Sequence, residues 1–316
     1  MPNKKRTIFT KILIWRYKYI SERQFILVLS VLVGFLAGLG TVLLKYLTLF
    51  IQSVLEGGFI RNYYYSLYFI FPIVGVWLVY LIKKNFLKKE IGHGISTTLY
   101  AISKRSGIIE RYKMFASFMV APITVGFGGS VGLQGPAVST GAAIGSNVAS
   151  MFHMNAKTRM LLIGCATAGA MSSMFKAPVA AIVFAVEIFS LDLVFTSLVP
   201  LLLASVAAVI TSYFFRGTDV LFSFELLDAW RVKDIVFYVF LGVATGIASV
   251  YFSKMYFLIT RFFAWFSNAY VKIGIAALAI GLMLYLFPPL YGEGYGLINN
   301  LLNGETEAAL NGIQYQ

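Results

Sequence analysis

Six long stretches of this sequence contain no Asp, Glu, Lys or Arg, and they limit what the chain can fold into. They run from 24 to 44, 62 to 82, 114 to 156, 193 to 215, 235 to 253 and 273 to 292. A helix needs about 20 apolar residues to cross the hydrocarbon of a bilayer, and most of these stretches have that length. We therefore expect an all-α, multi-pass integral membrane protein of roughly nine to eleven helices, several of which cross incompletely.

Composition supports this class and excludes others. Hydrophobic residues make up 59% of the chain and charged residues only 12%, whereas soluble domains are about a quarter charged. A soluble globule and a disordered chain are both excluded. Cys165 is the single cysteine, so a disulfide scaffold within the chain is excluded as well.

Basic residues predict the topology of the chain. The net charge is +13; seven Lys and Arg precede the first apolar stretch, and eight lie between Lys83 and Lys113. Because two spans separate the two basic clusters, both clusters lie on the same side of the membrane. The positive-inside rule predicts that this side is the cytoplasm. We expect residues 1–23 to be a basic cytoplasmic segment and residues 24–292 the transmembrane core, in the cell membrane. This placement argues against nucleic-acid binding, and the charged N-terminus does not resemble a cleaved signal peptide.

The third stretch is interrupted by glycine, which occupies five of the ten positions from Gly126 to Gly135. Proline is tolerated best in the first turn of a helix, so a helix is predicted to start at Gly135 or Pro136. Glycines before a helix start let backbone N–H groups gather around a small object, and the helix end adds partial positive charge. The pattern favours an anion site. Close helix packing through Gly141-x-x-x-Gly145 is an equally good explanation.

A second glycine turn, Gly92-His93-Gly94-Ile95-Ser96, also precedes a short apolar segment. It predicts another exposed helix start. His93 alone is more typical of a hydrogen-bonded interfacial side chain than of a ligand. Because the other histidine, His153, is far away in the sequence, we expect no metal site.

A third segment, from 160 to 187, carries Lys176 and Pro178 inside apolar sequence and predicts two short helices that meet at a turn. Together the three segments resemble the CLC family of chloride channels and proton-coupled chloride transporters. G-S-V-G-L-Q-G-P is similar to the family's G-x-x-G-x-E-G-P, and G-H-G-I-S to its G-S-G-I-P. F-K-A-P-V-A-A-I-V-F-A-V-E-I is similar to the F-x-A-P-x-x-x-x-x-F-x-x-E-E stretch. The conjunction, in this order, is more specific than any one motif.

The resemblance implies a CLC-type bundle of tilted and broken helices that binds chloride through backbone amides. Gly94 and Ile95 would then face the inner and central anion sites. His93 stands where most members have an anion-contacting serine, which leaves the preferred anion open. The outer site would be bordered by Gly132, Leu133, Gln134 and Gly135.

Two departures from the family pattern concern proton coupling. Gln134 occupies the position of the gating glutamate, and Ile188 that of the internal proton-relay glutamate. Since neither side chain carries a proton, we predict passive chloride conduction of the voltage-gated channel type. The alternatives are an H⁺/Cl⁻ antiporter-like secondary transporter, for which Glu187 and Lys176 are the intramembrane ionisable candidates unless they form an ion pair, and a non-conducting membrane scaffold or remnant.

The resemblance covers the first inverted repeat and the opening helices of the second, ending near Tyr295. Residues 293–316 are predicted to form a polar loop or tail, and we expect the chain to be a fragment of a longer protein. A natural short form completed by a separate chain and a non-functional remnant are the alternatives. The resemblance implies a homodimer, for which the small-residue faces between Ala177 and Phe215 are suited, although such faces suit contact within one chain equally well. We expect no cofactor, and no spacing typical of an enzyme active site is present.

Overall fold

The computed structural model describes residues 19–56, 64–89, 92, 94–189, 195–217, 221–222 and 231–304. Eleven α-helices, α2 to α12, and three short helical turns account for nearly all of them, and these residues contain no strand. The all-α class and the expected number of helices are confirmed. His93 and residues 1–18 lie outside the described part of the chain.

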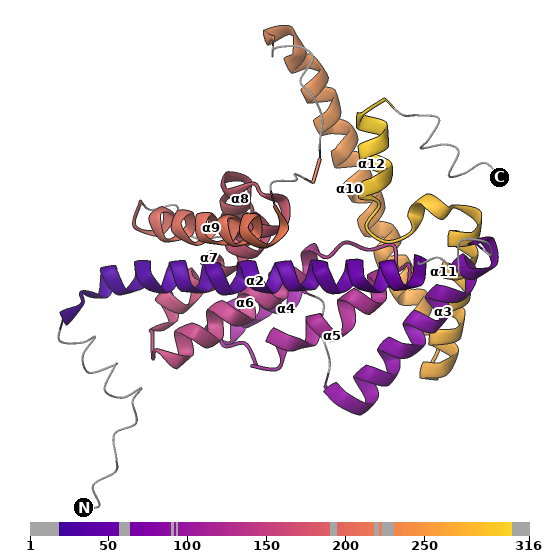
Figure 1. Ribbon diagram of the computed structural model, residues 1–316, viewed down its shortest axis with the longest axis horizontal. Helices are drawn as coiled ribbons and strands as arrows, with labels where there is room; N and C mark the ends of the chain where they lie inside the picture. Colours follow the sequence, from indigo (N-terminus) through magenta and orange to yellow (C-terminus); the bar gives the residue numbers. More distant parts are fainter. Residues whose placement is uncertain are drawn as a thin grey trace, which may run out of the picture.

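Helix α2 (Glu22–Glu56) has 35 residues and extends across most of the body of the molecule (Figure 1). The first charge-free stretch ends at residue 44, but α2 continues past Lys45 to Glu56. Helices α7 (Ala156–Phe175) and α9 (Phe195–Arg216) pack against it and against each other. Serine hydroxyl groups form hydrogen bonds between these helices. Ser212 Oγ of α9 donates to the Ser173 carbonyl of α7 at 2.9 Å, and Ser173 Oγ donates to the Gly38 carbonyl of α2 at 3.2 Å.

The long glycine-interrupted stretch forms two helices, α5 (Lys113–Gly126) and α6 (Gln134–Met151), as predicted. Helix α6 begins one residue earlier than expected. Its glycines pack directly on α7: a Cβ added at Gly145 would lie 2.8 Å from the Leu162 carbonyl carbon and 2.9 Å from Ile163 Cα. The packing explanation is therefore correct for Gly145, and it leaves the helix start itself free for another role.

The predicted turn near Lys176 is confirmed, because α7 ends at Phe175 and α8 (Pro178–Phe189) begins shortly after it. Helix α7 is not short, however, since it has 20 residues. Lys176 adopts φ 54° at the turn and donates from Nζ to the Gly217 carbonyl at 2.7 Å. Glu187 is exposed on α8. In the described part of the chain these two residues form no ion pair with each other.

The remaining helices complete the two ends of the body. Helix α3 (Tyr64–Ile82), continued by the π-helical turn η1 (Lys83–Leu87), packs on α11 (Ala269–Leu286), and α4 (Ile95–Lys104) lies beside α6. The 3₁₀ turn η2 (Val232–Asp234) precedes α10 (Ile235–Ala264). A second 3₁₀ turn, η3 (Pro288–Leu290), follows α11. Helix α12 (Tyr295–Leu302) is the last described helix.

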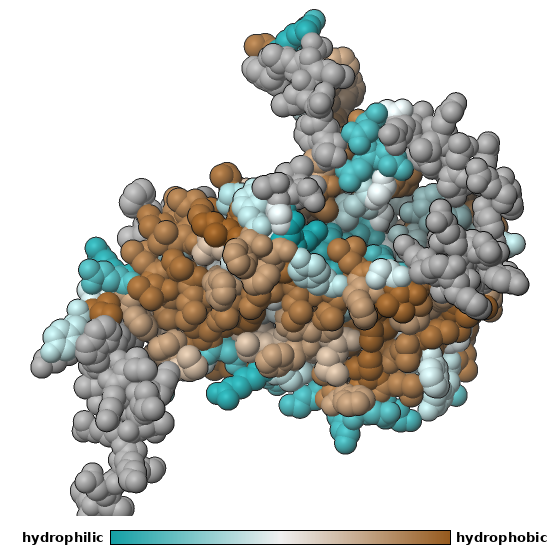
Figure 2. Space-filling view, in the orientation of Figure 1, coloured by the Kyte–Doolittle hydropathy of each residue, from teal (hydrophilic) through white to brown (hydrophobic). Residues whose placement is uncertain are grey.

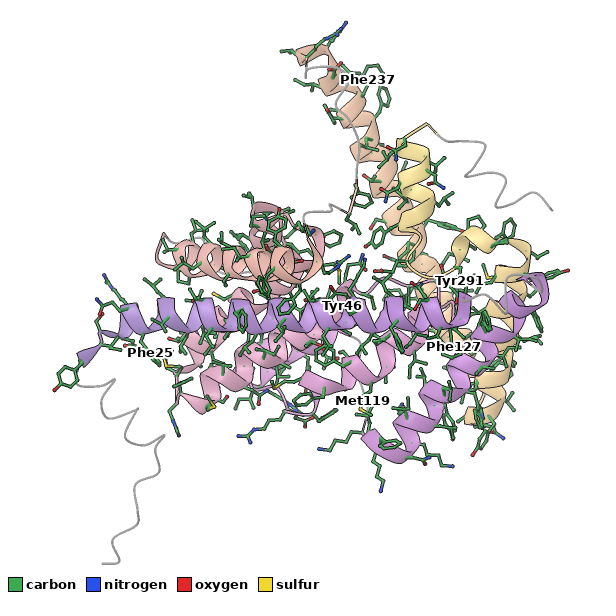
Figure 3. All side chains as sticks on the ribbon, viewed as in Figure 1. Phe25, Tyr46, Met119, Phe127, Phe237 and Tyr291 are labelled. Carbon is green, nitrogen blue, oxygen red and sulfur yellow. The ribbon has the colours of Figure 1, made fainter. Side chains whose placement is uncertain are left out.

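Apolar surface is extensive. Within the described ranges, five helices are long and apolar enough to cross a membrane, namely α2, α3, α9, α10 and α11. Figure 2 shows hydrophobic surface over much of the body, with hydrophilic residues along its edges. Helix α10 has no buried residue among its 30; one end projects from the body, where Phe237 lies (Figure 3).

Candidate functional site: a junction of two helix starts

The two predicted glycine turns meet in space although they are far apart in the sequence. Gly94 precedes the first residue of α4 and has φ 52°, which favours glycine. A Cβ added there would lie 3.3 Å from the Gly135 carbonyl oxygen, so the backbones of the two turns are nearly in contact. The structure thus brings Gly94 and Ile95 to the start of α6. It describes no position for His93.

The start of α6 carries backbone donors that the helix itself does not use. Leu133 is its N-cap residue and supplies no side-chain cap, and the first N–H groups of a helix have no partner within it. The Gln134 side chain folds back over Gly132, where any Cβ would collide with the side-chain amide. A side chain at position 132 would therefore displace the Gln134 amide, whereas an added Cβ at Gly135 would meet no atom within 4 Å.

Residues 291–295 fold over this junction from the far end of the sequence. Tyr291 donates from its hydroxyl to the Gly126 carbonyl at 2.6 Å, and Tyr291 and Phe127 lie near the same end of α2 (Figure 3). Gln134 Nε2 donates to the Tyr295 hydroxyl at 2.6 Å. Part of the segment predicted to be a polar loop or tail is helical, because α12 covers residues 295–302, and no residue of α12 is buried.

An ion pair that the sequence did not reveal lies in the same place. Lys45 Nζ is 3.1 Å from Glu293 Oε2, and the two side chains are only 8% and 11% exposed. The other carboxylate oxygen, Oε1, accepts from the Leu133 N–H at 3.4 Å. The only signal in the sequence is that Lys45 directly follows a long charge-free stretch. In the structure, α2 continues through this residue.

Tyr295 connects the ion pair to Gln134. Its ring lies 4.9 Å from Lys45 Nζ, close enough for a cation–π contact. Burial, together with the negative charge of Glu293, raises the pKa of the Tyr295 hydroxyl from 10.0 to about 12. The hydroxyl is therefore neutral at physiological pH, so the Gln134–Tyr295 hydrogen bond joins two uncharged groups.

The other predicted residues lie elsewhere. Ile188 is half-buried on α8 and packs on the apolar cluster that includes Ala142 of α6 and Ile163 of α7. Glu187, beside it, points to the exposed side of α8. Among the described residues, no three His, Cys, Asp or Glu side chains come together in a way that would hold a metal ion.

The junction holds backbone N–H groups, an amide, a phenol hydroxyl and an ammonium that already pairs with the Glu293 carboxylate. The N–H, amide, hydroxyl and ammonium groups can each donate to an anion. A site with partial positive charge from helix ends and backbone amides can hold an anion and still release it.

Comparisons with known proteins agree with this geometry. The family model described as voltage gated chloride channel matches residues 74–314. The H(+)/Cl(-) exchange transporter ClcA of Vibrio cholerae is 26% identical over 300 residues, which cover 90% of this chain and 64% of that protein. Chloride channel protein CLC-f of Arabidopsis thaliana is 27% identical over 203 residues, covering 61% of this chain and 26% of that one. The chain thus spans just under two thirds of the length of the Vibrio relative.

A solved structure shows the same fold. The crystal structure of a CLC-type fluoride/proton antiporter matches with a TM-score of 0.73 at 24% identity, covering 87% of this chain and 69% of that one. Since the family model covers more than half of the sequence and the helical arrangement agrees, the chain belongs to the CLC family of voltage gated chloride channels.

Proposed function

We propose that this chain contributes an anion path across the cell membrane, with chloride as the ion, and that conduction is passive and independent of protons. The observation that carries the proposal is the meeting of two glycine-lined helix starts at Gly94 and Gly135. Neither start has a side-chain cap, so both leave amide donors for a small anion.

The absence of proton coupling is argued from side chains. Gln134 stands at the mouth of α6 and bonds to the neutral Tyr295 hydroxyl, and an amide does not ionise. Ile188 packs on an apolar cluster, and an isoleucine side chain does not ionise. The relatives named as H(+)/Cl(-) exchange and fluoride/proton antiport proteins favour the second candidate function, an H⁺-coupled anion antiporter.

The proposal extends to the setting of the chain. The basic clusters favour a cytoplasmic N-terminus, and in this proposal the pathway works as a homodimer in the membrane. Conduction requires neither a cofactor nor enzymatic chemistry, since the anion crosses unchanged.

The test uses the full chain in liposomes. With a chloride gradient imposed, we expect chloride efflux without uphill proton movement, measured with a chloride electrode and a pH dye in parallel. Uphill proton movement would establish the antiporter instead, and absence of any flux would favour a non-conducting protein.

A substitution tests the position of the gate. Gln134→Glu places a carboxylate at the α6 start, where it competes with the permeating anion, so chloride flux should fall severalfold. The matched control is Gln134→Met, which keeps the length of the side chain without charge and should retain flux. Equal flux in the Glu and Met variants from pH 4 to 8 would show that residue 134 is not the gate.

A further inference from the structure

A cavity lined by lysines lies between the end of α3 and the start of α11, two helices that pack against each other (Figure 1). Its volume is about 530 Å³, within the range of about 300–1,000 Å³ that is typical of ligand pockets. The positively charged side chains in its wall are Lys83, Lys84, Lys88, Lys89 and Lys272. None of its lining residues belongs to the junction of helix starts, so this lysine cavity is a separate feature of the molecule.

No described carboxylate neutralises the lysine cavity. Its lining residues include no Asp or Glu, and neither of the two ion pairs in the described part of the chain involves one of these lysines. Like charges around one cavity repel each other, although salt screens part of the repulsion. A bound anion replaces this repulsion by attraction, so the cavity has the charge of an anion-binding site.

Two tyrosines hold one of the ammonium groups beside the cavity. Lys84 Nζ donates to the Tyr270 hydroxyl at 3.3 Å, and it lies 6.0 Å from the centroid of the Tyr80 ring. The two tyrosine rings pack edge to face, with their centroids 5.5 Å apart. An ammonium group has three donors. The tyrosine hydroxyl takes one of them, which leaves two for a ligand.

Lys272 is the most informative of the five lysines. The lysines from 83 to 89 lie at the end of the α3 span, where basic residues ordinarily set the topology of a membrane protein. Lys272 comes instead from α11, three residues after the first residue of that helix, Ala269. A helix start carries partial positive charge, which disfavours a cation. A bound anion offsets both this effect and the repulsion from the other lysines.

The surroundings of the cavity favour a phospholipid as the source of that anion. Both α3 and α11 are long and apolar enough to cross a membrane. Ile273 adds apolar surface to the cavity wall, and Val74 and Trp77 expose apolar side chains further along α3. A ligand with a phosphate group and acyl chains therefore contacts the lysines and the apolar surface together. Basic pockets between membrane helices bind lipid head groups in this way.

We infer that the lysine cavity binds the phosphate of an anionic phospholipid head group. Lys84 and Lys272 contact the phosphate from two different helical segments, so the lipid links the end of α3 to the start of α11. This inference does not rest on the proposed function, because the cavity shares no residue with the junction.

The experiment measures ligand binding to the purified full chain in a neutral detergent by native mass spectrometry. The probes are cardiolipin, which carries two phosphates; phosphatidylcholine, which has no net charge; and sodium pyrophosphate, a soluble source of the same phosphate chemistry. We expect cardiolipin to bind with a lower Kd than phosphatidylcholine does. Pyrophosphate should displace little cardiolipin, because it has no acyl chains to contact the apolar surface.

Substitution of two lysines from different helical segments tests the site. A basic residue near an anionic lipid surface contributes about 1 kcal/mol, or about fivefold in Kd, so Lys84→Gln combined with Lys272→Gln should raise the Kd of cardiolipin by about 30-fold. The matched control combines Lys104→Gln with Lys157→Gln. It removes the same charge from exposed lysines outside the cavity, so it should leave this Kd unchanged.

Two further variants guard against a loss of folding. Lys84→Arg combined with Lys272→Arg keeps both charges and should bind cardiolipin as the wild type does. If the double Gln variant does not fold, Lys272→Gln alone should raise the Kd of cardiolipin by about fivefold.

Each outcome decides the inference. Selective binding of cardiolipin that only the cavity substitutions weaken supports it. Equal weakening by the control pair would show a general attraction to a positive surface and would overturn it, as would equal Kd values for cardiolipin and phosphatidylcholine. Binding of pyrophosphate without binding of cardiolipin also overturns it, since the ligand would then be a soluble phosphate. None of these readouts is a chloride flux, so they are independent of whether the proposed function holds.

Discussion

Gly145 is where the packing of helix α6 can be tested most sharply. A Cβ added there would lie 2.8 Å from the Leu162 carbonyl carbon and 2.9 Å from Ile163 Cα, and closer still to the Leu162 carbonyl oxygen. Real Cβ atoms essentially never approach heavy atoms within 3.0 Å. All three atoms belong to the backbone, so no side chain can rotate away, and α6 and α7 must separate.

The magnitude follows from two opposing effects. Adding a methyl group to a packed interior costs about 1–3 kcal/mol, and replacing glycine by alanine within a helix recovers about 0.5–1 kcal/mol. The two effects differ by about 0–2.5 kcal/mol, and because the atoms that the new Cβ meets belong to the backbone, we expect Gly145→Ala to lower the free energy of unfolding by about 1–2.5 kcal/mol. Because the displaced helix carries residues 134 and 135, chloride flux should fall as well.

The control is Gly246→Ala in α10, where no atom lies within 4 Å of an added Cβ. Only the helix-propensity effect remains there, so stability should rise by about 0.5–1 kcal/mol. Both variants are measured by circular dichroism during unfolding in mixed SDS micelles, and flux is measured in liposomes. Gly145→Ala at or above wild-type stability would refute the close packing of α6 on α7.

Two further predictions concern the Ser146 hydroxyl in α6 and the Tyr295 hydroxyl at the junction. Ser146 Oγ accepts from the Ile109 N–H at 2.9 Å and donates to the Gly107 carbonyl at 2.6 Å, so Ser146→Ala should lower the free energy of unfolding by about 1–3 kcal/mol. In the control, Ser150→Ala, the lost bond lies within one helix, and the free energy of unfolding should fall by less than about 0.5 kcal/mol. Equal losses in the two variants would contradict the argument. Because burial raises the pKa of Tyr295 to about 12 from 10.0, the stability that this hydroxyl contributes is complete below pH 10 and is lost as the pH rises toward 12. The absorbance difference between wild type and Tyr295→Phe should show a tyrosine that titrates near pH 12, and a transition at pH 10 would disprove the shift.

Local chemistry explains what the sequence predicted correctly. Gly94 permits the positive φ before α4, and Pro136 favours the first turn of α6, so the two helix starts followed from the sequence alone. The turn at Pro178 followed in the same way. Each of these features depends on the chain only a few residues to either side.

Lys45 and Glu293 were missed because their meaning depends on a contact between distant parts of the sequence. A lysine after a charge-free stretch normally marks the end of a membrane span, and a glutamate between glycines normally marks a solvated turn. The charges neutralise each other in the folded chain, so α2 continues past Lys45 and the Glu293 side chain is largely buried. Periodicity and composition carry no information on that pairing.

The same separation sets an order of events during synthesis. Chains elongate at about 5–20 residues per second, so roughly 12–50 s pass between the making of Lys45 and the making of Glu293. During that time the Lys45 ammonium has no counterion from Glu293, and an unpaired lysine in a membrane span costs up to about 2.5–3.5 kcal/mol. The Lys45–Glu293 ion pair is therefore a late contact, which forms only after residues 291–295 have been synthesised.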